Sequence, residues 1–271
     1  MDCGPDPPQR GKFSVLIYLA VAPEQLPQAL RFTERIAHVA YRIGPDGRLA
    51  RRNVLPRTRG GLLVLEDWEC GPVRDAAALC RDVWRECGNR GYGGVVADFT
   101  GEPSEDKAAF LEALGAVLNR NRMKFFVPEP YGQRVGQASV LICTAISGGV
   151  LRQRLEAAAE RFGPARVSLD LQRLRMSFPL PCPEGEGTPL SGEALEALLR
   201  EREPSIFYSG DLCAKYFTCT RGGESRFIMF DDADTLRRKI QLGRELGLNA
   251  GFLMYPETVD LLPTLFGKND R

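Results

Sequence analysis

Histidine is nearly absent from this chain, whose 271 residues include a single one, His38. A Ser–His–Asp or Cys–His catalytic group would have to use that residue, and zinc sites are poorly supplied. His38 lies in the apolar run Ile36–Tyr41. A hydrogen-bonded histidine in the core is therefore the simpler interpretation, and we expect no metal site.

Long apolar runs and an excess of one charge are also lacking. No run approaches the roughly 18 residues that a membrane span needs. Met1 to Lys12 is polar and proline-rich, without an apolar signal segment. Lys plus Arg is 36 and Asp plus Glu is 35, which gives no electrostatic reason to bind nucleic acid or an anionic membrane. We expect a cytoplasmic protein with disordered residues 1–12 and neither of these partners.

Paired cysteine motifs are missing too, although the chain has eight cysteines. No CxxC pair occurs, Cys80 and Cys87 share a predicted helix, and Cys143 lies in an apolar run. This pattern is typical of reduced, mostly buried thiols rather than of disulfides or a metal site. We expect no cofactor.

Short apolar runs alternate with helical patterns along the chain, which at 271 residues and 44% hydrophobic content can bury a large core. Eight such alternations favour a closed (β/α)8 barrel of the TIM type over an open sheet. The predicted strands are 13–20, 36–43, 61–65, 91–100, 123–127, 139–145, 166–171 (continuing raggedly to 178) and 251–255. The predicted helices are 23–33, 73–87 (ended by Gly88), 103–118, 148–162, 193–202, 231–246 and 259–266.

Two segments depart from simple alternation. Arg48–Arg59 is basic and has no helical pattern, so the second crossover is expected to lack a helix. Residues 179–230 combine a proline-rich loop, a helix and short strands around the turn Arg221-Gly222-Gly223. We expect one domain, residues 13–271, with a small β-hairpin insertion at about 179–230, before the last βα unit.

The predicted strand 91–100 changes from apolar to polar along one face. Strand alternation puts Val96, Asp98 and Thr100 on one side, with apolar residues between them on the other. Parallel α/β folds place their chemistry at the carboxyl ends of the strands. Asp98 is therefore expected to point into the mouth of the barrel, as an inherited site residue or in an ion pair with Arg173 or Arg175.

The stretches Tyr92–Phe99 and Phe230–Glu257 resemble family-18 glycoside hydrolases, the chitinase-like barrels, and particularly the spore-germination branch that acts on cortex peptidoglycan. The family's fourth strand carries the pattern D-x-x-D-x-D-x-E. The corresponding positions in this chain are Gly93, Val96, Asp98 and Thr100. The resemblance implies a mechanism in which the final glutamate donates a proton, the substrate's N-acetyl group attacks, and the neighbouring aspartate orients it.

The resemblance also implies a loss of that reaction. A threonine hydroxyl at position 100 cannot supply the proton near neutral pH. Thr144-Ala145-Ile146 stands where the family's sixth strand has a Tyr-Asp pair, and Tyr255 stands where it has tryptophan. We therefore expect a catalytically silent barrel that binds a glycan, a peptidoglycan fragment or a protein partner at its C-terminal mouth.

Two alternatives stay open. One is an active glycosidase with a rewired acid/base pair, Asp98 with Glu129 or Glu102. The other is a sporulation-associated scaffold, which depends on the resemblance alone. Acidic, hydroxyl and aromatic side chains near the predicted strand ends are the candidates for ligand binding. For each single acid a solvated position at a loop or helix start is the favoured interpretation, and packing explains most of the aromatics equally well. The candidates are Tyr18, Glu66, Asp67, Trp68, Thr100, Tyr131, Tyr255 and Glu257.

Overall fold

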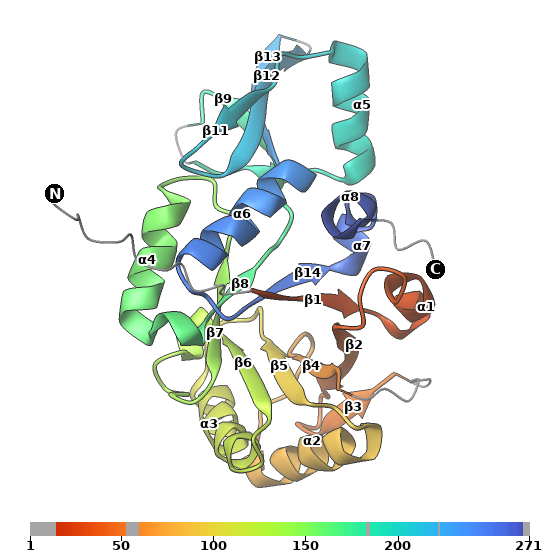
Figure 1. Ribbon diagram of the computed structural model, residues 1–271, viewed down its shortest axis with the longest axis vertical. Helices are drawn as coiled ribbons and strands as arrows, with labels where there is room; N and C mark the ends of the chain where they lie inside the picture. Colours follow the sequence, from red (N-terminus) through yellow and green to blue (C-terminus); the bar gives the residue numbers. More distant parts are fainter. Residues whose placement is uncertain (1–14, 53–59, 183–184, 222, 268–271) are drawn as a thin grey trace, which may run out of the picture.

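A computed structural model describes residues 15–52, 60–182, 185–221 and 223–267, so the expected disorder of residues 1–12 lies outside the described residues. Eight parallel strands close into a ring, because β1 pairs with both β2 and β14. The closed barrel predicted from the alternation is confirmed (Figure 1). Its strands are β1 (Leu16–Val21), β2 (Ile36–Ile43), β4 (Leu62–Glu66), β5 (Gly94–Asp98), β6 (Lys124–Pro128), β7 (Ser139–Cys143), β8 (Val167–Asp170) and β14 (Ala250–Met254).

The barrel interior is filled by side chains and is not a pore. The rings of Tyr18 and Phe252 stack with their centroids 5.3 Å apart, and Phe126 packs edge-on against both. Val64 and Val96 belong to the same interior cluster. Alternate residues of each strand point outward instead, where they pack against the helices in two larger apolar clusters.

Helices form the outer layer of the barrel, and their ends follow local capping chemistry. Helix α2 runs past Gly88, the predicted end, to Arg90, because the left-handed conformation that ends it is taken by Gly91, at φ 70°. Helix α6 begins after Asp232, which forms a capping box with Thr235. The barrel helices are α1 (Leu26–Ala29), α2 (Ala76–Arg90), α3 (Glu105–Arg120), α4 (Leu151–Phe162), α6 (Ala233–Glu245), α7 (Tyr255–Thr258) and α8 (Leu262–Phe266).

Two predicted helices differ from the observed ones. Residues 23–33 form only the 3-10 turn η1 (Pro23–Gln25) and the short α1. The predicted closing helix 259–266 is shorter, as α8, and an additional short helix, α7, starts directly at Tyr255. Two other 3-10 turns, η2 (Glu129–Tyr131) and η3 (Pro164–Arg166), precede β7 and β8. Within the described ranges, no helix combines the length and the apolar character that crossing a membrane requires.

The second crossover carries a strand where a helix would normally lie. Strand β3 (Leu49–Arg51) pairs antiparallel with the end of β2. The rest of the expected helix-free segment includes residues 53–59, which lie outside the described residues.

The insertion forms a separate lobe with its own sheet, drawn at the top of Figure 1. It begins at Arg175, so the ragged continuation of the seventh strand belongs to this second sheet and not to the barrel. Its antiparallel order is β10 (Thr188–Pro189), β9 (Arg175–Leu180), β13 (Glu224–Phe230), β12 (Ala214–Arg221) and β11 (Phe207–Ser209). Helix α5 (Gly192–Arg202) covers one face through Leu195, which packs on Phe217.

Candidate functional site at the C-terminal mouth of the barrel

Three carboxyl groups come from the inward-facing last positions of barrel strands. Glu66 ends β4, Asp98 ends β5 and Asp170 ends β8. Glu66 and Asp98 are register partners on adjacent strands. Two residues before them, Val64 and Val96 point into the interior cluster, so period-two alternation directs both acids inward as well. The acids thus form a polar layer above an apolar barrel.

Burial and the charges of neighbouring acids raise the pKa of two of these carboxyl groups. The pKa of Asp98 is raised to about 6, chiefly by burial and in addition by the charges of Glu66 and Asp67. Burial raises the pKa of Asp170 to about 7, with additional contributions from the charges of Asp98 and Glu257. A hydrogen bond of 2.9 Å from Gln172 Nε2 to Asp170 Oδ2 partly opposes this effect. These two carboxyl groups therefore take up protons at a higher pH than an ordinary aspartate does, and in the protonated form they donate as well as accept hydrogen bonds.

Of the two alternatives for Asp98, the ion pair with Arg173 or Arg175 is not formed. Arg173 Nη1 lies 2.7 Å from Asp260 Oδ1, and it also donates to the backbone oxygen of Glu257. Within the described part of the chain, Asp98 has no salt bridge to any cation. Arg173 instead ties the loop after β8 to the segment that follows α7.

Asp67 organises the loop that carries Thr100. Its Oδ1 accepts a hydrogen bond of 2.9 Å from the backbone N–H of Thr100, and its Oδ2 accepts one of 2.6 Å from Lys107 Nζ. Asp67 is buried, whereas Thr100 is exposed. Asp67 is therefore a structural acid that fixes the backbone at position 100.

Glu129 and Glu102 do not join Asp98. Glu129 Oε2 lies 2.7 Å from Arg154 Nη2 and faces a groove beside the start of α4, lined also by Gly148 and Gly149. Glu102 is exposed on the loop after β5. Neither contributes to the raised pKa of Asp98. The carboxyl coupled to Asp98 from across the sequence is Asp170, which the sequence-based candidates did not include.

The fold of this chain is similar to that of several solved structures. No family model matches the chain, and no curated protein sequence matches it. Among solved structures, the spore cortex-lytic enzyme SleL of Bacillus cereus is similar, with 19% identity, coverage of 96% of this chain and 76% of that chain, and a TM-score of 0.69. A chitinase from Chromobacterium violaceum matches with 14% identity, coverage of 95% and 100%, and a TM-score of 0.72.

A third similar structure is a GH18 chitinase from Cycas revoluta in complex with (GlcNAc)4. It matches with 14% identity, coverage of 93% of this chain and 98% of that chain, and a TM-score of 0.66. This chain has a family-18-like barrel. The fold implied by the residue patterns around Asp98 and Tyr255 is thereby confirmed.

Three candidate tyrosines do not line the mouth of this family-18-like barrel. Tyr18 OH accepts a hydrogen bond from Lys124, the first residue of β6, so it points to the opposite, N-terminal end. Tyr131 is buried edge-on against Phe99 in the layer between strands and helices. Tyr255 is also packed in that layer. Strand alternation explains the last case, because the inward position at the end of β14 belongs to Met254.

Trp68 and Glu257 do lie near the acids. The guanidinium of Arg42 stacks over the Trp68 ring at 4.2 Å, and Arg42 is the register partner of Glu66. Trp68 is 47% exposed. Glu257 is close enough to raise the pKa of Asp170. The described mouth therefore offers four acids, one arginine and one exposed indole.

Asp170 and Arg42 were missed for different reasons. Asp170 was detectable, because it occupies an alternate position of the predicted strand 166–171, in phase with the buried Ser168. Arg42 was not, because an irregularity in the pairing between Val39 and Tyr41 shifts the phase of β2. Without that irregularity, Arg42 would face the helices.

The only histidine lies away from the mouth. His38 is buried, 5.3 Å from the Tyr92 ring, and burial lowers its pKa to about 4. The expected position in the core is therefore confirmed, and the Nε2 atom has no hydrogen-bond partner among the described residues. The same residues contain no group of three or more His, Cys, Asp and Glu able to hold a metal ion.

Proposed function

We propose that this family-18-like barrel binds an oligosaccharide containing N-acetylglucosamine at its C-terminal mouth and does not carry out the family-18 reaction. The observation that carries the proposal is the contrast between Asp98, the last residue of β5, and Thr100 in the loop that follows. Asp98 keeps an inward-facing carboxyl, while Thr100, two residues later, presents a hydroxyl on an exposed loop. A hydroxyl of this kind is too weak an acid to protonate a leaving oxygen.

The surroundings of Thr100 support the same conclusion. The acid that touches this loop, Asp67, is already engaged by Lys107 and by the Thr100 backbone. It is therefore not free to replace the glutamate expected at position 100. The neighbouring acid Glu102 points from an exposed loop and has no coupling to Asp98.

The chemistry of the mouth suits sugar binding. Carboxyl groups with raised pKa values, such as Asp98 and Asp170, donate and accept hydrogen bonds to hydroxyl and acetamido groups. The exposed Trp68 presents a ring face of the type on which sugars pack. On the insertion sheet, Phe207 stacks on Tyr216, which in turn packs on Phe227.

That aromatic face lies on the same side of the barrel as the acids. Its apolar cluster includes Ala145, which follows the C-terminal end of β7, and Leu174, which follows β8. Phe207 is 55% exposed. The acids and the aromatic rings thus offer two neighbouring surfaces for one extended ligand.

The sugar class comes from the similar structures and is part of the proposal. One of them is a chitinase in complex with (GlcNAc)4, and another is a spore cortex-lytic enzyme. Chitin oligomers and fragments of cortex peptidoglycan are accordingly the ligands to test. A role in sporulation would follow from binding of the second but not the first.

One observation favours a second candidate function, hydrolysis with a rewired acid. Asp170 has a pKa of about 7 beside Asp98 at about 6. A carboxyl group whose pKa is raised toward neutral pH is suited to act as a general acid. In this candidate Asp170 donates the proton, instead of Glu129 or Glu102.

Calorimetric titration with (GlcNAc)4 and with a cortex muropeptide tests the proposed binding. We expect saturable binding of at least one ligand, weakened about tenfold or more in Asp98→Asn/Asp170→Asn, because the hydrogen bonds from the ligand to the two carboxyl groups are lost or weakened. Glu129→Gln is the matched control and is expected to bind normally. No binding of either ligand by the folded wild-type protein overturns the proposal.

A further inference from the structure

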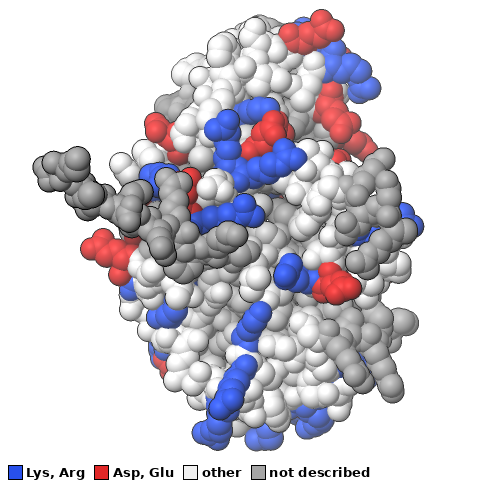
Figure 2. Space-filling view, in the orientation of Figure 1, with Lys and Arg blue, Asp and Glu red and all other residues white. Residues whose placement is uncertain are grey.

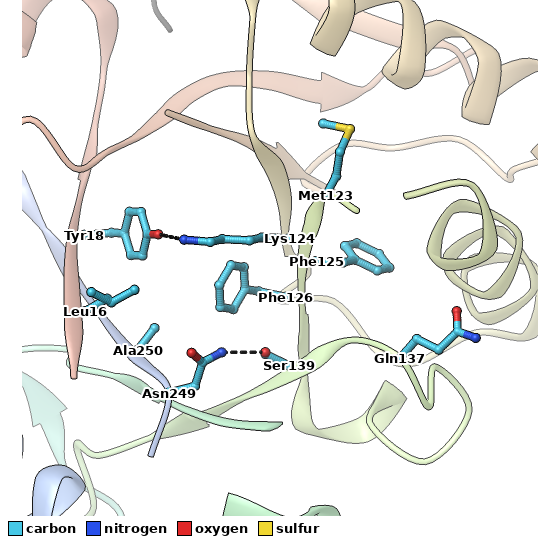
Figure 3. A pocket seen from close by; sticks show the side chains of 10 residues that line it. All are labelled: Leu16, Tyr18, Met123, Lys124, Phe125, Phe126, Gln137, Ser139, Asn249 and Ala250. Carbon is cyan, nitrogen blue, oxygen red and sulfur yellow. Dashed lines mark hydrogen bonds between the residues drawn. The ribbon is translucent and has the colours of Figure 1, made fainter. Parts of the chain in front are cut away.

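A second polar site lies at the opposite, N-terminal end of the barrel. A cavity of about 140 Å³ opens there between the first residues of β1, β6, β7 and β14. This volume is well above the roughly 10–15 Å³ that one water needs. Figure 3 shows Lys124 and Tyr18 reaching toward each other on one side of it, with Asn249 and Ser139 on the other.

The polar groups of this cavity are mainly hydrogen-bond donors. Lys124 Nζ donates to Tyr18 OH at 2.6 Å, which leaves two ammonium hydrogens and the phenol hydrogen available. Asn249 Nδ2 donates to Ser139 Oγ at 3.0 Å, which leaves the hydroxyl hydrogen of Ser139 available. Gln137 adds an amide at the rim.

The cavity has a cation and no anion. None of its lining residues carries a carboxylate, and Lys124 forms no ion pair with the described acids. In Figure 2, basic residues stand without acidic neighbours where Figure 1 draws β6. An ammonium group held in a partly enclosed site without a counter-charge favours an anionic ligand.

The ammonium group is held in place by a rigid support. Tyr18 is buried, and its ring is stacked on Phe252 and packed against Phe126, so its hydroxyl is fixed at the cavity floor. Lys124 remains exposed along part of its side chain, which leaves the cavity open to solvent. Ser168 on β8 is the register partner of Ala250, one of the residues that line the cavity. Its hydroxyl Oγ is fully buried and has no hydrogen-bond partner among the described residues.

We propose that this cavity binds a small oxyanion, a phosphate or a carboxylate group, through Lys124, Tyr18 and Ser139. The ammonium group of Lys124 attracts the anion, and the hydroxyl groups of Tyr18 and Ser139 orient it by donating hydrogen bonds. This site is separated from the mouth acids by the packed rings inside the barrel, so its test is independent of carbohydrate binding.

The test is an NMR titration of the full chain with inorganic phosphate, acetate and chloride at constant ionic strength. We expect saturable amide shifts at residues 124, 139 and 249 with phosphate or acetate, and not with chloride. Saturation by phosphate alone identifies a phosphate group as the ligand, and saturation by acetate alone identifies a carboxylate. Both results support the site.

Variants decide whether the named groups are responsible. Lys124→Met is expected to weaken binding about tenfold or more, and Tyr18→Phe several-fold while keeping the ring packing. Arg120→Met, an exposed cation at the end of α3, is the control and is expected to bind normally. Absence of saturable shifts with both oxyanions, equal shifts with chloride, or unchanged binding in both Lys124→Met and Tyr18→Phe overturns the proposal.

Discussion

The negative charge of Asp98 raises the pKa of Asp170, although the two residues belong to barrel strands β5 and β8 and are far apart in the sequence. Each is the last inward-facing residue of its strand. Neither has a salt bridge to a described cation. The barrel thus concentrates acidic groups where buried charge is unfavourable, and this arrangement has consequences for stability as well as for binding.

Neutralising either acid should stabilise the protein at neutral pH. Because both folded-state pKa values are raised, the folded protein binds more protons than the unfolded chain between about pH 4 and 7, and stability falls as pH rises through that window. Asp98→Asn and Asp170→Asn are expected to gain about 1–3 kcal/mol at pH 7.5 and almost nothing at pH 4. Urea unfolding at both pH values measures this.

Glu102→Gln serves as the control for that experiment, because Glu102 is an exposed acid on the loop after β5. Its unfolding free energy should differ little from that of the wild type at either pH. Equal or lower stability of both Asn variants at pH 7.5 would contradict the described environment of the acids.

The single histidine should oppose folding under acidic conditions. Its pKa is lowered to about 4 in the folded state, so below about pH 6.5 the unfolded chain binds the additional proton. Stability from this group is complete above pH 6.5 and is lost as pH falls toward 4. Since His38 is the only histidine, its proton NMR signal can be assigned without ambiguity. A measured pKa near 6.5 would show that the ring is not buried as described.

The buried ion pair between Lys239 in α6 and Asp231 just before that helix should contribute strongly to folding stability. Lys239 Nζ lies 2.7 Å from Asp231 Oδ2, and both side chains are fully buried. Asp231 also accepts hydrogen bonds from the Leu174 N–H and the Thr235 hydroxyl. Lys239→Met leaves the buried carboxylate of Asp231 without its cation. We therefore expect the free energy of unfolding, measured in urea, to fall by about 3–5 kcal/mol.

A surface pair provides the comparison. Glu156→Gln removes one of the two acidic partners of Arg152, at 3.7 Å, where both side chains are about half exposed, and leaves the pair with Glu245. Its effect should stay within about 0.5 kcal/mol. Similar losses for the two variants would mean that the Lys239 pair is more solvated than the structure shows.

The bond from the Thr100 amide to Asp67 predicts slow hydrogen exchange at that amide. In Asp67→Ala the Thr100 N–H and the Lys107 ammonium both lose their acceptor. Exchange at Thr100 should accelerate about tenfold or more, while the stability loss stays near 1–3 kcal/mol. Glu69 is an exposed acid two residues after Asp67 in the loop that follows β4. Glu69→Gln is the control and should leave the exchange rate of the Thr100 amide unchanged. Unaltered exchange in Asp67→Ala would remove the assigned role of Asp67.

Much of the barrel was readable from residue patterns. The short apolar runs with terminal acids predicted β4 and β5 closely, and alternation along β5 correctly separated Val96 from Ala97. The predicted helix 231–246 also agrees closely with α6, whose first turn is capped by Asp232. These features depend on neighbours in sequence, so the sequence contains their signals.

Features set by tertiary pairing could not be read in the same way. Residues 175–180 look like a continuation of β8, and only pairing with β13 assigns them to the second sheet. Tyr18 and Tyr255 are both close to strand ends, yet the direction of each side chain depends on the phase and height of its strand in the ring. Asp170, whose pKa is raised by the charge of Asp98, was not among the candidates because it is far from Asp98 in the sequence and closure of the barrel brings it near.

Release of reducing ends from (GlcNAc)4 and from cortex peptidoglycan, followed from pH 4 to 8, tests the central claim most directly. A barrel with Thr100 in place of the proton donor should release none above the no-protein background, even where the ligand binds. Release that disappears in both Asp98→Asn and Asp170→Asn, and that declines as pH rises past about 7, would contradict the account and establish Asp170 as the acid of an active hydrolase.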